Sequence, residues 1–183
     1  MELKFDADKH IYLRGEEIVP SVSAVLGKAY YTEFDFSRVD RGVLQAAADY
    51  GTYIHDLIEN WLIKKQEPTC VPLELDNFVG WWLDNGFEFI SSEQIIDGGW
   101  YGGKYDILAR DPVSDRRILI DIKTTSTVSK KKWQKQLTMY NNVLKCDDML
   151  VIWLHNDKMR TVVLEDLGEE FVEETRRLYL SEM

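Results

Sequence analysis

Residues 118–127, ILIDIKTTST, combine the composition of a buried β-strand with two charged side chains. Four of the first five residues are aliphatic and favour a strand, namely Ile118, Leu119, Ile120 and Ile122. Side chains alternate across a strand, so Asp121 and Lys123 point to one face while the neighbouring isoleucines and Thr124 point to the other. A carboxylate and an amine side by side in such a strand need a physical reason.

The segment before this strand predicts its pairing partner. YDILAR is joined to RRILIDIK by the turn DPVSD. A hairpin centred between Val113 and Ser114 places Asp106 opposite Asp121, and opposed residues on one face have Cβ atoms about 5 Å apart. Two carboxylates and Lys123 are therefore predicted to converge on one face, whereas a register slip of one residue would separate them.

Two carboxylates this close repel each other, and burial strengthens the repulsion. A divalent cation relieves it, and hard oxygen ligands suit Mg²⁺ or Mn²⁺. Such an ion lowers the pKa of bound water and stabilises charge on a phosphoryl oxygen. Lys123 would then hold the attacking water or the pentacoordinate phosphate. The structural alternative is that Asp106 and Asp121 form two salt bridges, with Lys104 and Lys123 as the partners.

The rest of the chain predicts one α/β domain. A small hairpin is expected over 3–18, and a short helix that Pro20 and Ser21 open and Gly27 closes. Further helices are expected over 41–66, 73–86, 130–145 and 166–182, and strands within 87–96, 104–110, 116–125, 149–155 and 160–166. We expect a single domain over 1–183, with a mainly helical part at 1–87, a catalytic sheet with a crossover helix at 88–165 and a C-terminal helix at 166–183.

The helix predicted over 41–66 has one apolar face at three- and four-residue spacing. Its members are Leu44, Ala47, Ala48, Gly51, Ile54, His55, Ile58 and Leu62. His55 is therefore expected to point inward whether or not it binds a metal. Glu59, one turn later, is expected on the surface.

Composition limits the partners of the chain. Hydrophobic residues make up 45% and aromatic residues 12%, which favours a folded domain over disorder. No apolar run approaches the roughly 18 residues of a membrane span, so no membrane partner is expected. We expect a cytoplasmic location. The net charge of −10 argues against binding of nucleic acid, but residues 116–135 alone carry seven Lys/Arg and one acid. This basic segment is the predicted phosphate-binding part, although its lysine-rich end could equally be a solvated helix start.

Five features in fixed order resemble one family. Asp106, followed fifteen residues later by Asp121-Ile122-Lys123, resembles the motif of the PD-(D/E)XK nucleases. GGKYD is similar to the Gly-rich approach to the first acid in their RecB-like branch, and QLTMY, with Gln136 and Tyr140, is similar to the Q-x-x-x-Y of that branch. GTYIH, which contains Gly51 and His55, is similar to its upstream helix, and Glu93 falls where the family often has an acid. The resemblance spans residues 51–140, about half the chain.

The resemblance implies a restriction-endonuclease-like core, which is a mixed central β-sheet flanked by helices, here with an N-terminal helical segment. It implies a metal-dependent DNA exonuclease that uses one or two Mg²⁺ or Mn²⁺ ions. Asp106, Asp121 and the carbonyl of Ile122 would bind the metal, with His55 and Glu93 completing the ligand shell. The implied catalytic set adds three residues that aid the nucleophile, contact DNA or support the site, namely Lys123, Gln136 and Tyr140.

The small size resembles stand-alone phage or bacterial exonucleases of recombination and repair, in a bacterial or phage-infected cell. A recombination or replication protein is a further expected partner. The four-cysteine iron–sulfur cluster of some relatives is not expected, because the chain has two cysteines, Cys70 and Cys146. Two alternatives stay open, a non-catalytic module that binds nucleic acid or protein and a structure-selective endonuclease. The sequence leaves polarity, strand preference and oligomeric state undetermined.

Overall fold

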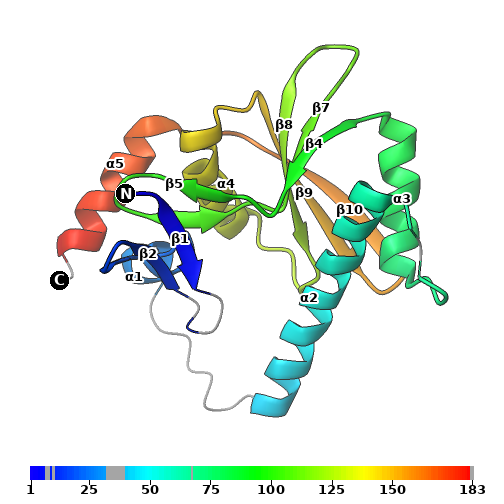
Figure 1. Cartoon of the computed structure of the whole chain (residues 1–183), viewed down its shortest axis with the longest axis horizontal. Helices are drawn as coiled ribbons and strands as arrows, with labels where there is room; N and C mark the ends of the chain where they lie inside the picture. Colours follow the sequence, from blue (N-terminus) through cyan, green and yellow to red (C-terminus); the bar gives the residue numbers. More distant parts are fainter. Residues whose placement is uncertain (7–8, 10, 32–39, 67, 182–183) are drawn as a thin grey trace.

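The computed structural model describes residues 1–6, 9, 11–31, 40–66 and 68–181. Its centre is a five-stranded mixed sheet flanked by helices (Figure 1). In spatial order the strands are β10 (Lys158–Leu164), β9 (Asp148–His155), β8 (Arg117–Lys123), β7 (Ile107–Arg110) and β4 (Glu88–Ser92). β8 and β9 are parallel and the other neighbours are antiparallel. A parallel pair needs a crossover, and α4 (Lys130–Leu144) supplies it as predicted.

The register of the central hairpin is the predicted one. Ile107 pairs with Ile120 and Arg110 with Arg117, so the same register brings Asp106 opposite Asp121 one step beyond the end of β7. The turn DPVSD fixes it, since Asp111 accepts hydrogen bonds from its own turn residues.

The alternation of β8 divides the core into two layers. Ile118, Ile120 and Ile122 pack under α2 (Arg41–Lys64) and α3 (Leu73–Asn85). Leu119 packs on the opposite face, in the cluster built with α1 (Val22–Tyr30), α4 and α5 (Gly168–Ser181). Asp121 and Lys123 share the face of Leu119, so they lie between the sheet and α4, as the period of two predicts.

A second group of strands packs beside the main sheet. β1 (Leu3–Asp6), β2 (Ile11–Arg14) and β3 (Glu17–Val19) form an antiparallel sheet, and β5 (Ile95–Asp97) pairs with β6 (Gly102–Lys104). The backbone N–H of Gly102 donates to the carbonyl of Pro20 at 2.9 Å, and Arg14 pairs with Asp97 at 2.6 Å. The N-terminal sheet is thereby attached to the β5–β6 ribbon.

The predicted end of the first helix is wrong. Ser21 caps α1 through the N–H of Ala24, as expected, but the helix continues through Gly27 to Tyr30. The Tyr30 ring stacks on Phe171 at 5.7 Å and its hydroxyl lies 2.9 Å from Thr175 Oγ1. These contacts with α5 offset the intrinsic cost of a helical glycine, which is about 1 kcal/mol.

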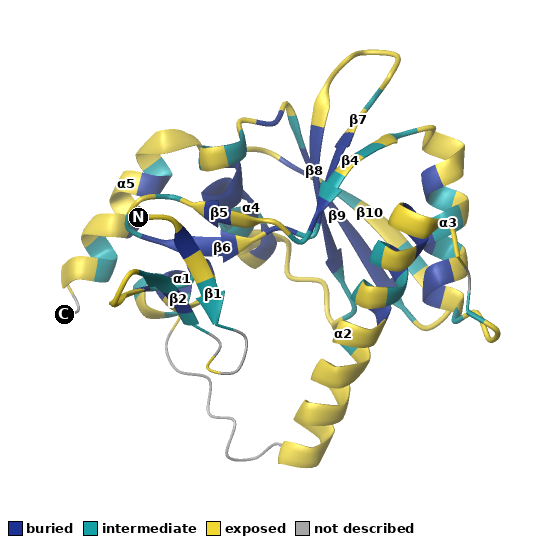
Figure 2. Ribbon diagram, viewed as in Figure 1, coloured by how far each residue is buried: buried dark blue, intermediate teal, exposed yellow. Residues whose placement is uncertain are grey.

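The apolar face of α2 is buried only in its second half. Ile54, Ile58 and Leu62 are buried as predicted, whereas Leu44 is 37% exposed and the alanines near it are also exposed. The first turns of α2 extend beyond the sheet and are exposed, with no layer of the described residues packed on them (Figures 1 and 2). Among the described residues, no helix is both long enough and apolar enough to cross a bilayer.

Candidate functional site

Two strand predictions fail at the same place, and the candidate acids lie there. Segment 87–96 is divided into β4 and β5 at Glu93 and Gln94, and segment 104–110 into β6 and β7 at Tyr105 and Asp106. Glu93 has φ of 53°, a left-handed conformation that is uncommon for a residue with a side chain. Its N–H donates to the carbonyl of Asp106 at 3.1 Å. Both segments therefore leave the central sheet at the same place, where the backbone hydrogen bond holds Glu93 next to Asp106.

His55 of α2 completes a cluster with these two acids. One ligand atom from each of His55, Glu93 and Asp106 lies within 4.8 Å of the others, and His55 Nδ1 is 3.6 Å from Asp106 Oδ2. Gly51 allows this approach, because a Cβ there would come 3.0 Å from Thr124 Oγ1 beyond the end of β8. A helix with a larger residue at this position would stand farther from the sheet, and His55 with it.

Asp106 is held by the neighbouring strand. Its Oδ2 accepts a hydrogen bond from the backbone N–H of Ile122 at 2.6 Å. Burial raises the pKa of Asp106 to about 6, and the charge of Asp121 adds to the rise, against smaller lowering effects of His55 and Lys123. The register predicted that the two carboxylates lie close together, and the contribution of Asp121 to the raised pKa of Asp106 agrees with this proximity.

Asp121 lies beside Lys123 in the interior. Its side chain is 2% exposed, and its Oδ2 is 2.7 Å from Lys123 Nζ. The contact has the length of a hydrogen bond but not its angles, so among the described residues no group hydrogen-bonds this oxygen. Burial lowers the pKa of Lys123, but the charges of Asp121 and Asp106 outweigh it and raise the pKa. We therefore regard Lys123 as charged and as the ion-pair partner of Asp121.

The predicted salt-bridge alternative is half right. Lys123 pairs with Asp121, but Lys104 pairs with Glu93 instead of Asp106. Asp106 keeps a backbone donor and His55 as its neighbours. Among the described residues, His55, Glu93 and Asp106 each offer a ligand atom within 4.8 Å of the other two. Asp121 does not belong to this group.

Gln136 and Tyr140 lie on α4, which packs on the face of β8 that carries Asp121 and Lys123. Gln136 Nε2 donates to the Tyr140 hydroxyl at 3.0 Å, as the spacing of four residues predicts. Burial raises the pKa of Tyr140, and the charges of Asp121 and Asp106 raise it further, against the hydrogen bond from Gln136. Tyr140 therefore stays a neutral phenol whose proton is available for a further hydrogen bond.

The two glycines of GGKYD make room for two aromatic rings. A Cβ on Gly103 would come 2.7 Å from Tyr140 Cε1, and a Cβ on Gly102 would come 2.8 Å from Tyr12 Cγ. Gly103 thus lets the Tyr140 ring approach β6 directly.

We predict that Gly103→Ala displaces Tyr140 and destabilises the protein by about 1–3 kcal/mol, the usual cost of overpacking. Urea denaturation measures this cost. Gly27→Ala is the matched control, because nothing lies within 4 Å of its added Cβ and the helix gains a better helix former. Equal stabilities of Gly103→Ala and wild type would contradict the proposed contact.

Two residues of this region have no signal in the sequence motifs. Glu59, expected on the surface, is half-buried and accepts a hydrogen bond from Ser92 Oγ at 2.8 Å, directly before Glu93. Tyr12 of β2 is 6% exposed, and burial with the charge of Glu93 raises its pKa to about 12. The position of Glu59 one helical turn after His55 could have indicated that it lies near the site. Tyr12 could not be found in this way, because it comes from a separate sheet.

The basic segment 116–135 is not one surface. Arg116 pairs with Asp148 at 2.9 Å, and Arg117 donates to the carbonyl of Leu144 at 3.1 Å, at the start of β8. Lys123 lies at the other end of this seven-residue strand, and three exposed lysines begin α4. The predicted phosphate-binding segment is thus reduced to the end of β8 and the start of α4.

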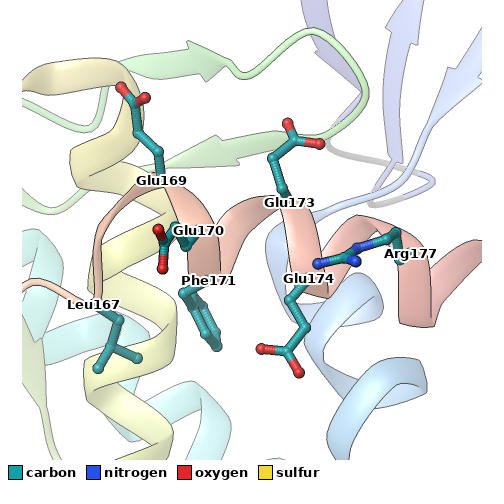
Figure 3. Close-up of a pocket in the computed structure, with 7 residues that line it drawn as sticks. All are labelled: Leu167, Glu169, Glu170, Phe171, Glu173, Glu174 and Arg177. Atoms are coloured by element: carbon teal, nitrogen blue, oxygen red, sulfur yellow. The ribbon is translucent and has the colours of Figure 1, made fainter.

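A pocket of about 620 Å³ lies elsewhere, along α5 (Figure 3). Four glutamates line it, namely Glu169, Glu170, Glu173 and Glu174. A polyanion would be repelled there, and none of its lining residues belongs to the cluster around Asp106. We therefore place the candidate site at the cluster and not at this pocket.

Two of the solved structures that this chain resembles are described as exonucleases. LHK-Exo, an alkaline exonuclease from Laribacter hongkongensis solved in complex with dAMP, has a TM-score of 0.50 and 15% identity, over 90% of this chain and 85% of that chain. A phage-related exonuclease from Haemophilus somnus 129PT has a TM-score of 0.49 and 12% identity, over 90% of this chain and 91% of that chain. No family model and no curated protein matches the sequence.

Because the sequence identity to LHK-Exo is low, the similarity shows the fold alone. The mixed α/β sheet with flanking helices that the sequence predicted is therefore confirmed. The assignment to the RecB-like branch stays a prediction, as do the roles of the individual site residues.

Proposed function

We propose that the protein is a divalent-metal-dependent deoxyribonuclease that removes nucleotides from DNA ends. The observation that carries the proposal is the cluster of His55, Glu93 and Asp106 beside the buried pair of Asp121 and Lys123. Three partly buried potential ligands lie beside a buried carboxylate and an amine at the junction of two sheets, and two of the acids, Asp106 and Asp121, are close enough to raise the pKa of Asp106.

The donor set fits a hard divalent cation. Carboxylate oxygens with one imidazole nitrogen suit Mg²⁺ or Mn²⁺ better than a soft metal. Asp121 Oδ2, buried and without a well-aligned donor in the described chain, adds an oxygen with free acceptor capacity. His55, Glu93, Asp106 and Asp121 would hold the ion, with the carbonyl of Ile122 as a further ligand. When bound, the ion would supply Lewis-acid stabilisation of a phosphoryl oxygen and a more acidic water.

The chain's own residues would position the reactants. The Lys123 ammonium group would orient the attacking water and offset the negative charge that develops on the phosphate. Water oxygen bonds to phosphorus and the bond to the 3′ oxygen breaks, which leaves a 3′ hydroxyl and a 5′ phosphate. Tyr140, neutral and supported by Gln136, would donate a hydrogen bond to the nucleotide or to a site carboxylate. We propose that this exonuclease acts in phage or bacterial recombination and repair.

Digestion of end-labelled linear DNA and closed circular DNA, each with Mg²⁺, Mn²⁺ or chelator, tests the proposal. We expect progressive release of nucleotides from linear DNA, no cutting of the circle and no activity in chelator. Cutting of the circle would favour the structure-selective endonuclease. DNA binding without cleavage under all metal conditions would contradict the proposal and favour the non-catalytic binding module.

A further inference from the structure

The Glu93 carboxylate has a cationic partner within the chain. Lys104 Nζ forms an ion pair with Glu93 Oε2, and the side chains are 42% and 24% exposed. Lys104 ends β6 and lies two residues before Asp106, whose carboxylate belongs to the same cluster as Glu93. One acid is thus shared between an ammonium group and the candidate metal site.

The two uses of Glu93 oppose each other. An ammonium group and a divalent cation on one carboxylate repel each other strongly at contact distance. The free energy of binding the ion is therefore reduced, either by this repulsion or by the cost of displacing the ammonium group. Lys123 opposes an ion at Asp121 in the same way, but Asp121 lies outside the cluster of His55, Glu93 and Asp106. Within the cluster, Ile122 donates to Asp106 through an uncharged backbone N–H, and Tyr12 beside Glu93 stays a neutral phenol.

We propose, on the basis of the nuclease function above, that Lys104 is an exchangeable counter-ion: a divalent cation displaces it from Glu93, and the released ammonium binds a phosphate of the DNA. Exposure supports the second half, since the Lys104 side chain reaches solvent next to the cluster whereas Lys123 is only 19% exposed. The flexible stem of lysine allows its charge to move several ångströms without a change in the backbone. The left-handed backbone of Glu93 and its bond to Asp106 keep the acid in position during the exchange.

Calorimetric titration with Mn²⁺ tests the first half. We expect Lys104→Met to tighten Mn²⁺ binding at least threefold, because the competitor for Glu93 is gone. Lys104→Gln is a second variant with the same expected result. Lys145→Met is the matched control, since Lys145 pairs with Glu169 at 2.8 Å elsewhere on the surface, and its Mn²⁺ affinity should equal that of wild type. The difference should persist at 0.5 M salt, where long-range field effects are screened. Asp106→Asn, which should abolish the binding, identifies the site.

Fluorescence anisotropy with a 5′-phosphorylated DNA hairpin tests the second half, with Ca²⁺ as the ion and gel analysis to verify that the DNA stays intact. We expect Lys104→Met to bind DNA at least threefold more weakly than Lys145→Met does. The slope of log affinity against log salt should fall by about 0.7–0.9, the value of one lost phosphate contact.

The outcomes separate the inference from the proposed function. If wild type binds Mn²⁺ and degrades DNA, but Lys104→Met matches Lys145→Met in metal affinity and salt slope, only the inference is overturned and the pair is structural. Tighter Mn²⁺ binding with unchanged DNA affinity overturns the phosphate half. If wild type neither binds Mn²⁺ nor degrades DNA, the proposed function fails and the inference fails with it.

Discussion

Lys123→Ala is expected to lower the rate of DNA cleavage by about 10³-fold, the usual scale for removing a preorganised charge from a transition state. Lys123 is the ammonium group at the end of β8, beside Asp121 and near Asp106. No other described lysine forms an ion pair with Asp121, so another side chain cannot take its place without rearrangement. Single-turnover cleavage of end-labelled DNA at saturating Mn²⁺ measures the effect.

Removal of Lys123 also leaves the buried Asp121 without its cation. Breaking a buried pair from one side costs about 3–5 kcal/mol, so thermal unfolding and circular dichroism must accompany the assay. Lys123→Arg keeps the charge but moves it to a planar fork, and we expect it to fold normally and still lose most activity. Lys145→Ala is the control for loss of a surface lysine. Full metal-dependent activity in a folded Lys123→Ala protein would remove Lys123 from the mechanism.

The metal-free protein is expected to lose stability as the pH rises through about 6, by an amount on the order of 2–3 kcal/mol from Asp106 alone. Burial and the charge of Asp121 raise the pKa of this carboxyl above its ordinary value of 3.8. The folded state therefore holds the proton more tightly than the unfolded chain does. The stabilisation is fully present below pH 3.8 and is lost as the pH passes the folded value.

Asp106→Asn removes this titration. In chelator, we expect the stability difference between wild type and Asp106→Asn to change by about 2 kcal/mol between pH 4.5 and pH 7.5, with the variant the more stable at pH 7.5. Urea denaturation at several pH values measures it. Asp84→Asn, at an exposed position of α3, is the control and should show no such change. Mn²⁺ should restore wild-type stability at pH 7.5 and leave Asp106→Asn unaffected. Parallel pH profiles for wild type and Asp106→Asn would contradict this account of the two carboxylates.

Local rules of strand geometry predicted the centre of the molecule. The alternation along residues 118–123 and the turn DPVSD fixed the register, so the shared face of Asp121 and Lys123 followed from the sequence. The spacing of Gln136 and Tyr140 likewise predicted one helix face, and their hydrogen bond agrees with it. These features depend on residues close in the chain or on a single hairpin.

Features that depend on distant segments could not be predicted in the same way. Glu93 has a left-handed conformation at the point where segment 87–96 is divided, although the segment looks continuous in sequence, and its ion pair with Lys104 joins it to a separate strand. α1 extends to Tyr30 because α5 provides contacts from the other end of the chain. The first turns of α2 carry an apolar pattern that no described element covers, so periodicity alone overestimated its burial.

The most direct test of the central claim is a diffraction experiment on crystals soaked in Mn²⁺, with data collected to record the anomalous signal of manganese. The account predicts a strong anomalous peak among His55, Glu93 and Asp106, with Asp121 within reach of the same ion and Lys123 adjacent. A peak confined to the glutamates of α5, or no peak at this cluster at millimolar Mn²⁺, would contradict it.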